Sequence, residues 1–165
     1  MTTVDLVIED ARWEALALPR LADTATRTAL AVAGAPEGYE IVLMACDDIR
    51  IGALNAEFRG KPTPTNVLSW PAHDLAPLVP GEVPPRPPAP DGFDDALGDI
   101  ALAYETCVRE ARTQGKPIEH HITHLILHAT LHLLGYDHVT EADAELMEGL
   151  ERKALAQLGI ADPYS

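Results

Sequence analysis

The sequence predicts an α+β domain in which four strands and five helices share one core. Three observations support this prediction: short apolar runs rich in β-branched residues, longer stretches with apolar side chains at helical spacing, and glycine or proline between them. The chain has 165 residues, and 47% of them are hydrophobic, which is sufficient for one domain with its own core. We therefore expect residues 1–165 to form a single domain.

The first part of the chain predicts a strand, a helix, a strand and a helix, in that order. Residues 4–8 and 40–45 are short apolar runs bounded by polar residues, a pattern typical of half-buried strands. Between them, residues 21–33 are rich in alanine and contain no proline, which favours a helix. Either Asp47 or Asp48 can cap the second helix through its carboxylate. The apolar residues expected on the buried face of that helix are Ile49, Ala53, Leu54 and Phe58.

The middle of the chain predicts a third strand followed by a long irregular segment. Residues 60–66 contain two prolines and two threonines, which indicates a loop, and the apolar run at residues 67–70 predicts the strand. From residue 71 to residue 96 the chain is rich in proline and acidic side chains. Such a composition is too polar and too poor in N–H donors to form a packed element. We expect a flexible or polyproline-like surface insertion there.

The remaining sequence predicts the fourth strand, at residues 99–103, and three helices. The first of these helices, at residues 104–114, is closed by Gly115. The next begins near Pro117, whose missing N–H would have no intrahelical partner in a first turn, and runs to Leu134. Apolar residues occupy most of its circumference, which predicts that it is the central, buried helix.

Capping signals follow this central helix. Gly135 can end it as a left-handed C-cap. Thr140 and Asp143 stand three residues apart, as in a capping box, and open a last helix that ends near Gly159.

The net charge of −14 is unusual for a nucleic-acid enzyme, because affinity for a phosphate backbone normally comes from clustered lysine and arginine. Net charge governs solubility and long-range steering, however, rather than the chemistry of a local site. A small basic patch is therefore compatible with this composition, and Arg59 with Lys61 is the candidate.

The sequence predicts a cytoplasmic protein without disulfides. No stretch approaches the roughly 18 uninterrupted apolar residues that a membrane span requires. Asp5, Glu9 and Asp10 stand where a secretory signal would be basic and then apolar. Cys46 and Cys107 form no C-x-x-C motif, so we expect buried free thiols rather than a disulfide or a thiolate zinc site.

The chain carries the run HATLHLLGYDH at residues 128–138. His128 and His132 are four residues apart, so a helix presents both imidazoles on one face. A third ligand eight residues away on the same straight helix would lie about 12 Å along the axis, too far to share one cation. A turn at Gly135 can instead bring His138 back to the other two. Three neutral imidazoles with an open fourth position describe a catalytic zinc site, and we predict one zinc ion per chain on these three histidines.

Ordinary buried histidines are the alternative interpretation of this pattern. Several imidazoles on an otherwise apolar helix would be costly to bury without partners, and a shared metal removes that cost. His124, one turn before His128, is expected in a supporting position beside the metal or in the core. His73, His120 and His121 are predicted only at loop or helix-start positions.

The spacing of the histidines also matches the zinc-binding run of metzincin proteases. Those proteases carry glutamate directly after the first histidine as general base, whereas this chain has Ala129. An alanine side chain cannot accept a proton, and loss of a general base removes a factor of about 10² to 10⁴ in rate. A zinc metallopeptidase lacking this glutamate is therefore the weaker alternative.

Three segments together resemble the YbeY family of bacterial endoribonucleases that mature ribosomal RNA. They are LNAEFRGK at residues 54–61 continued by TNVLSWP at 65–71, the short LGDI at 97–100, and the histidine run at 128–138. The order and spacing of these segments match as well, so the resemblance spans about residues 47–151.

The resemblance implies a compact α+β fold, with helices around a small mixed sheet and zinc held in a cleft. It also implies zinc-dependent cleavage of single-stranded RNA, maturation of the 3′ end of small-subunit (16S) ribosomal RNA, and a part in ribosome quality control. The implied partners are ribosomal RNA and the small ribosomal subunit, with a ribosomal protein or a GTPase as a targeting partner and no membrane.

Arg59 matches the arginine to which the family assigns a catalytic or phosphate-contacting role, and Lys61 is the neighbouring phosphate-binding candidate. A guanidinium can bind a phosphodiester through two hydrogen bonds and stabilise the charge that develops during its cleavage. Asp137 is expected to orient a ligand imidazole as a hydrogen-bond acceptor. Asp99 is predicted to be a turn residue that opens a strand.

The sequence leaves three functional hypotheses. The first is a zinc-dependent endoribonuclease in which Arg59 stabilises phosphate charge and no general base is assigned. The second is the metallopeptidase without its usual glutamate, and the third is a non-enzymatic ribosome assembly factor whose metal is chiefly structural. The open fourth position at the metal favours an enzyme over the third hypothesis.

Overall fold

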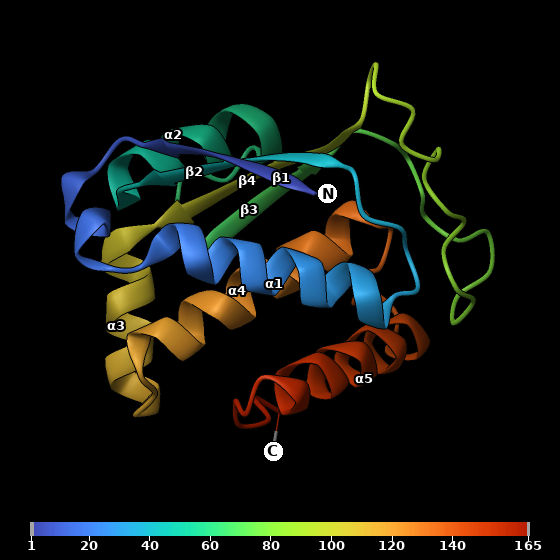
Figure 1. The fold of residues 1–165 in the computed structure, drawn as a ribbon. Coiled ribbons are helices and arrows are strands. Elements are labelled where there is room, and N and C mark those ends of the chain that lie inside the picture. Colours follow the sequence, from blue (N-terminus) through green and yellow to red (C-terminus); the bar gives the residue numbers. More distant parts are fainter. Residues whose placement is uncertain (1, 165) are drawn as a thin grey trace.

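The structure, a computed structural model, describes residues 2–164 and contains a mixed sheet of four strands (Figure 1). The strands are β1 (Thr3–Ile8), β2 (Glu40–Cys46), β3 (Val67–Pro71) and β4 (Ala96–Ala103). Their order in the sheet is β1-β2-β4-β3. β2 runs parallel to both of its neighbours, whereas β3 runs antiparallel to β4 at the edge. The small mixed sheet and the α+β class are therefore confirmed.

Helices cover both faces of this sheet (Figure 1). They are α1 (Leu18–Val32), α2 (Asp48–Arg59), α3 (Tyr104–Gln114), α4 (Ile118–Leu133) and α5 (Glu141–Gln157). α2 lies on one face, α1, α3 and α4 lie on the other, and α5 packs against α1 and α4. Most residues of α4 are buried, which confirms the predicted central helix. None of the helices within the described residues combines the length and apolar character needed to cross a bilayer.

The buried face of α2 differs from the prediction. Ile51 and Leu54 are buried against the sheet, whereas Ile49 and Phe58 are 83% and 58% exposed, and Ala53 is exposed as well. Residues two apart on a helix point about 200° apart, so the contact made by Ile51 turns Ile49 to solvent. The predicted buried face of α2 was therefore wrong, and of its four residues only Leu54 is buried.

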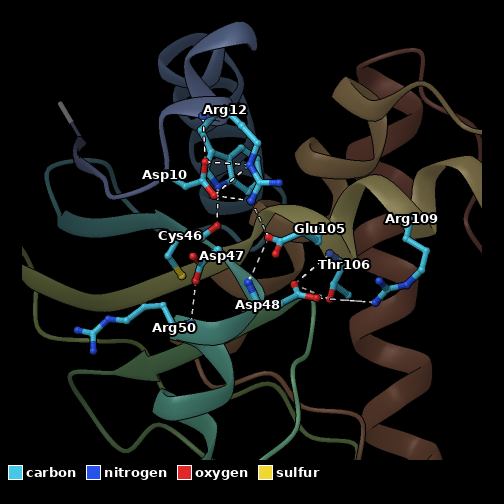
Figure 2. Close-up of polar contacts among 10 residues, drawn as sticks. Asp10, Arg12, Cys46, Asp47, Asp48, Arg50, Glu105, Thr106 and Arg109 are labelled. Carbon is cyan, nitrogen blue, oxygen red and sulfur yellow. Dashed lines mark hydrogen bonds and ion pairs between the residues drawn. The ribbon is translucent and has the colours of Figure 1, made fainter.

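Acidic side chains that follow β2 and β4 cap the helices that begin there and contact each other's helix (Figure 2). Asp47 caps α2 by accepting a hydrogen bond from the Arg50 backbone N–H at 2.8 Å. Asp48 instead serves α3, where it accepts from the backbone N–H and the hydroxyl of Thr106 at 3.1 and 2.8 Å. Glu105 accepts in return from the Asp48 backbone N–H at 3.3 Å. These contacts fix the starts of α2 and α3 relative to each other.

β4 starts at Ala96, three residues before its predicted start. Gly98 lies close to β3, because a Cβ on it would stand 2.4 Å from the Trp70 carbonyl oxygen. Asp99 is exposed and pairs with Trp70 and Val42 inside the sheet. The prediction that Asp99 opens the strand was wrong, since Ala96 and Gly98 already pair with the neighbouring strands.

A short 3-10 helix, η1 (Ala11–Ala15), was not predicted. It buries Trp13, whose indole N–H donates to the Cys46 carbonyl oxygen at 2.8 Å. Cys46 and Cys107 are buried and free, as expected. Burial raises the pKa of the Cys46 thiol to about 12 and also raises the pKa of Cys107.

The Pro-rich segment between β3 and β4 contains neither helix nor strand, as expected, yet it is attached to the domain at several points. The Tyr39 hydroxyl donates to the Pro88 carbonyl oxygen at 3.0 Å. The Gly81 N–H donates at 2.8 Å to Asp143, which also forms the predicted capping contact at the start of α5. Leu75 is 7% exposed, so the first part of the segment is packed against the domain.

Candidate functional site

Three histidines converge at the end of α4. His128 and His132 lie one turn apart, and their Nε2 atoms are 3.1 Å apart. His138 follows the turn after α4, and its ring centroid lies 5.4 Å from that of His128 and 5.2 Å from that of His132. One ligand atom from each ring lies within 4.8 Å of the others. The structure therefore brings together the three side chains that the spacing singled out.

The turn that returns His138 depends on Gly135. Gly135 has a φ of +99°, in the left-handed region that glycine adopts without strain. The Tyr136 N–H donates to the Leu131 carbonyl oxygen at 3.1 Å, as in a Schellman cap. A Cβ on Gly135 would lie 2.5 Å from the Leu75 carbonyl oxygen. The predicted C-cap is confirmed, and this glycine also allows the insertion to pack on the turn.

We expect Gly135→Ala to lower the free energy of unfolding by about 2 to 6 kcal/mol. A strained φ accounts for about 1 to 3 kcal/mol, and the forced contact with Leu75 adds a similar amount. Gly115→Ala is the matched control, because Gly115 also follows a helix at φ +65° but has open space around its Cβ position. Urea denaturation of both variants without metal would measure the difference, and equal losses would contradict the packing argument.

Hydrogen bonds on the far side of two rings indicate where their protons are. His132 Nδ1 is 2.9 Å from the Tyr136 carbonyl oxygen, which only accepts, so this nitrogen carries the hydrogen. His128 Nδ1 contacts Oε1 of Glu151, and an ionised carboxylate likewise requires a donor there. Burial, assisted by the neighbouring His128, lowers the pKa of His132 to about 4. The His132 ring is therefore neutral near pH 7.

With His128 in the neutral form that a metal ligand requires, two unprotonated nitrogens face each other. The Nε2 atoms of His128 and His132, 3.1 Å apart, cannot hydrogen-bond while both carry lone pairs. Two imidazole nitrogens on a tetrahedral zinc ion, each at about 2.0 to 2.1 Å, lie about 3.3 Å apart. A cation between them would remove their repulsion. The donor set, completed by His138, thus fits zinc with ligands that need not lose a proton.

Glu151, which the sequence analysis missed, reaches the site from α5. Its side chain is 0% exposed, with one carboxylate oxygen on His128 Nδ1 and the other accepting from the Tyr164 hydroxyl. His124 Nε2 lies 3.7 Å from the second oxygen. Burial alone would raise the pKa of Glu151, but contacts with His124, His128 and Tyr164 lower it to about 2. The carboxylate is therefore ionised at neutral pH.

His124 and Asp137 were predicted to support the metal ligands, but within residues 2–164 neither side chain hydrogen-bonds to a ligand imidazole. The His124 ring lies edge-on to that of His128, with centroids 6.1 Å apart, and its nitrogens have no hydrogen-bond partner in the described part of the chain. Asp137 accepts from the backbone N–H of His138 at 2.7 Å. Its carboxylate is 4.0 Å from His132 Nδ1, too far for a hydrogen bond. Asp137 thus holds the backbone of the turn.

A cleft of about 1080 Å³ opens beside the three histidines. Arg59 and Lys61 line this cleft, so the predicted phosphate-binding residues face the same space as the imidazoles. The Arg59 guanidinium donates to the Ser69 carbonyl oxygen at 2.8 Å, which holds it beside β3. His73, predicted only as a loop residue, lines the cleft as well. The arrangement combines a candidate cation site with positive charge, as phosphate chemistry requires.

Comparisons with known proteins find relatives along nearly the whole chain. A family model described as "Endoribonuclease YbeY" matches residues 7–159. The curated "Endoribonuclease YbeY" of Ruegeria pomeroyi is 60% identical over 166 residues, covering 99% of this chain and 98% of the relative. That of Dinoroseobacter shibae is 56% identical over 163 residues, with coverages of 98% and 90%. The solution structure of TM1509 from Thermotoga maritima has a similar fold, with a TM-score of 0.53 at 19% identity over 99% of both chains.

Proposed function

The chain belongs to the YbeY family of endoribonucleases, and we propose that it cleaves single-stranded RNA with one zinc ion held by His128, His132 and His138. The observation that carries this proposal is the convergence of three imidazoles at the wall of a cleft, with the Nε2 atoms of His128 and His132 3.1 Å apart. A zinc ion bound there supplies a Lewis acid that polarises the phosphodiester and makes water easier to deprotonate.

Arg59 and Lys61 would bind and orient the scissile phosphate. A guanidinium has five N–H donors, so the contact with Ser69 fixes the place of Arg59 and still leaves donors for two phosphate oxygens. Lys61 would add a positive charge at the same wall of the cleft. Charge that develops on the phosphate during cleavage would then be stabilised by groups already in position.

The proposed substrate is the 3′ end of small-subunit ribosomal RNA. The enzyme would act in the cytoplasm and take part in ribosome quality control. The resemblance of the three sequence segments supports this substrate. A net charge of −14 disfavours long-range attraction to RNA. A ribosomal protein or a GTPase on the small subunit would therefore bring the enzyme to its RNA, while Arg59 and Lys61 act only at contact.

Peptide hydrolysis is the alternative that the histidine spacing raises. Ala129, at the position where metzincins carry their catalytic glutamate, lines the cleft. Its methyl group cannot relay a proton to a leaving amine. Together with membership of an endoribonuclease family, this favours RNA as the substrate.

Removal of the metal should stop RNA cleavage reversibly. With an RNA hairpin that carries a single-stranded 3′ tail, we expect a chelator to lower the cleavage rate by about 10²-fold or more, and stoichiometric zinc to restore it. A fully double-stranded RNA and an unstructured peptide serve as controls and should stay intact throughout. Cleavage that survives complete metal removal would refute zinc dependence, and cleavage of the peptide alone would favour the peptidase. Zinc binding without any cleavage would favour the assembly factor.

A further inference from the structure

We propose that Glu151 is a positioning residue of the metal centre, which holds the His128 imidazole with its Nε2 toward the cation, and that Tyr164 keeps Glu151 in place. This inference rests on the zinc site proposed above. It assigns a role to two side chains that lie outside the histidine run, on α5 and on the segment that follows it.

The first step of the argument is the contact between Glu151 Oε1 and His128 Nδ1. A neutral ring that donates through Nδ1 presents a lone pair at Nε2, which is the atom that faces His132. The contact therefore fixes both the tautomer and the rotation of His128. A carboxylate in this position also increases the basicity of the imidazole and offsets part of the charge of a bound cation. His132 Nδ1, by comparison, donates to the neutral carbonyl oxygen of Tyr136.

The second step is the burial of Glu151. Its side chain is 0% exposed, although a carboxyl group is costly to bury unless hydrogen bonds or a positive group compensate it. Within residues 2–164 no lysine or arginine forms an ion pair with Glu151, and the contacts of this carboxylate are with His124, His128 and Tyr164. With these imidazoles neutral, a divalent cation on the far side of the His128 ring would supply a compensating positive charge.

The third step is the position of Tyr164, whose hydroxyl donates to the second oxygen of Glu151. The Tyr164 backbone N–H donates to Asp162 at 2.8 Å, and the same carboxylate accepts from Arg152 at 3.1 Å. The Arg152 guanidinium also lies 5.5 Å from the centre of the Tyr164 ring. These contacts hold the segment after α5 against the helix, so that Tyr164 lines the cleft and separates Glu151 from it.

A second cation is the competing interpretation, because ligand atoms of His124, His128 and Glu151 also lie within 4.8 Å of one another. Such a cation would need His128 Nδ1 as a ligand. That nitrogen is already in direct contact with the Glu151 carboxylate, which favours a hydrogen bond over a second metal.

The test measures zinc stoichiometry and zinc affinity by competition with a chelator, in the intact chain. We expect the wild-type protein to bind one zinc ion and Glu151→Gln to bind one zinc ion about 10- to 100-fold more weakly. Tyr164→Phe should show a smaller loss, below about tenfold. The matched controls are Glu145→Gln and Tyr104→Phe, which should bind zinc as the wild type does. Glu145 lies on the exposed side of α5, and Tyr104 packs against Trp13.

A readout on the metal-free protein separates positioning from general stability. In ¹⁵N spectra of the imidazoles, His128 should show a single Nδ1–H form in the wild type and a mixture of both forms in Glu151→Gln. Equal zinc affinities, or an unchanged His128 form in Glu151→Gln, would overturn the positioning role. Two zinc ions in the wild type and one in Glu151→Gln would overturn it in favour of a second metal site. If the wild type bound no zinc, the proposed function would fail, and the imidazole spectra would still decide the role of Glu151.

Discussion

Replacing His132 with alanine should remove both the bound zinc and RNA cleavage. We expect the zinc content to fall from about one ion per chain to below about 0.1, because two imidazoles cannot complete the coordination that three provide. Cleavage of RNA with a single-stranded tail should fall by at least about 10³-fold, since a Lewis acid contributes several kcal/mol to such a transition state. Metal analysis of the purified variants and single-turnover cleavage assays would measure the two effects.

His120→Ala is the matched control for this variant. His120 is exposed in the first turn of α4, on the same helix as His132, and its loss should change neither zinc content nor cleavage. Full zinc content in His132→Ala would overturn the ligand assignment. Loss of zinc with normal cleavage would instead show that the metal has no part in the reaction.

The histidine cluster was predictable because its geometry is local. His128 and His132 share a helix face through their spacing alone, and Gly135 marks where the helix must end. His138 follows three residues later, within reach of both rings. Only the capping geometry and the helical repeat are needed to bring these side chains together, and both can be derived from eleven consecutive residues.

Glu151 was not predicted because its contact with His128 joins two helices. One signal was present in the sequence: an acidic residue stands on the apolar stripe of the last helix, four residues from both Met147 and Leu155, which are buried. A carboxylate at such a position needs a buried partner. Its partner could not be named, because neither the direction of α5 relative to α4 nor the return of Tyr164 follows from local pattern.

The same limit explains the errors in α2 and β4. On α2 apolar residues occur on several sides, so the choice of Ile51 rather than Ile49 for the core depends on where the sheet lies. β4 pairs with β2, although α2, β3 and the Pro-rich segment separate them in sequence. Strand ends and neighbours are set by such long-range pairing, which single-sequence patterns do not encode.

Arg59→Ala should leave the zinc in place but lower RNA cleavage by about 10² to 10³-fold, the usual effect of removing one preorganised donor to a developing charge. Arg59 lines the cleft without contributing a metal ligand, and its contact with Ser69 is to a backbone carbonyl. Zinc content should therefore stay at about one per chain. Cleavage rates at saturating RNA, measured beside metal content, would distinguish this result from that of His132→Ala.

Two further variants make this last experiment specific. Arg50 lies on the same helix as Arg59 but pairs with Glu9 at 3.4 Å, outside the cleft, so Arg50→Ala should cleave as the wild type does. Arg59→Lys keeps the charge but loses the planar pair of donors, so we expect it to restore RNA binding more than the cleavage rate. If Arg59→Lys cleaved at the full rate, charge alone would explain the role of Arg59. If Arg59→Ala itself cleaved normally, the phosphate contact would have to come from another residue of the cleft, with Lys61 the nearest candidate in sequence.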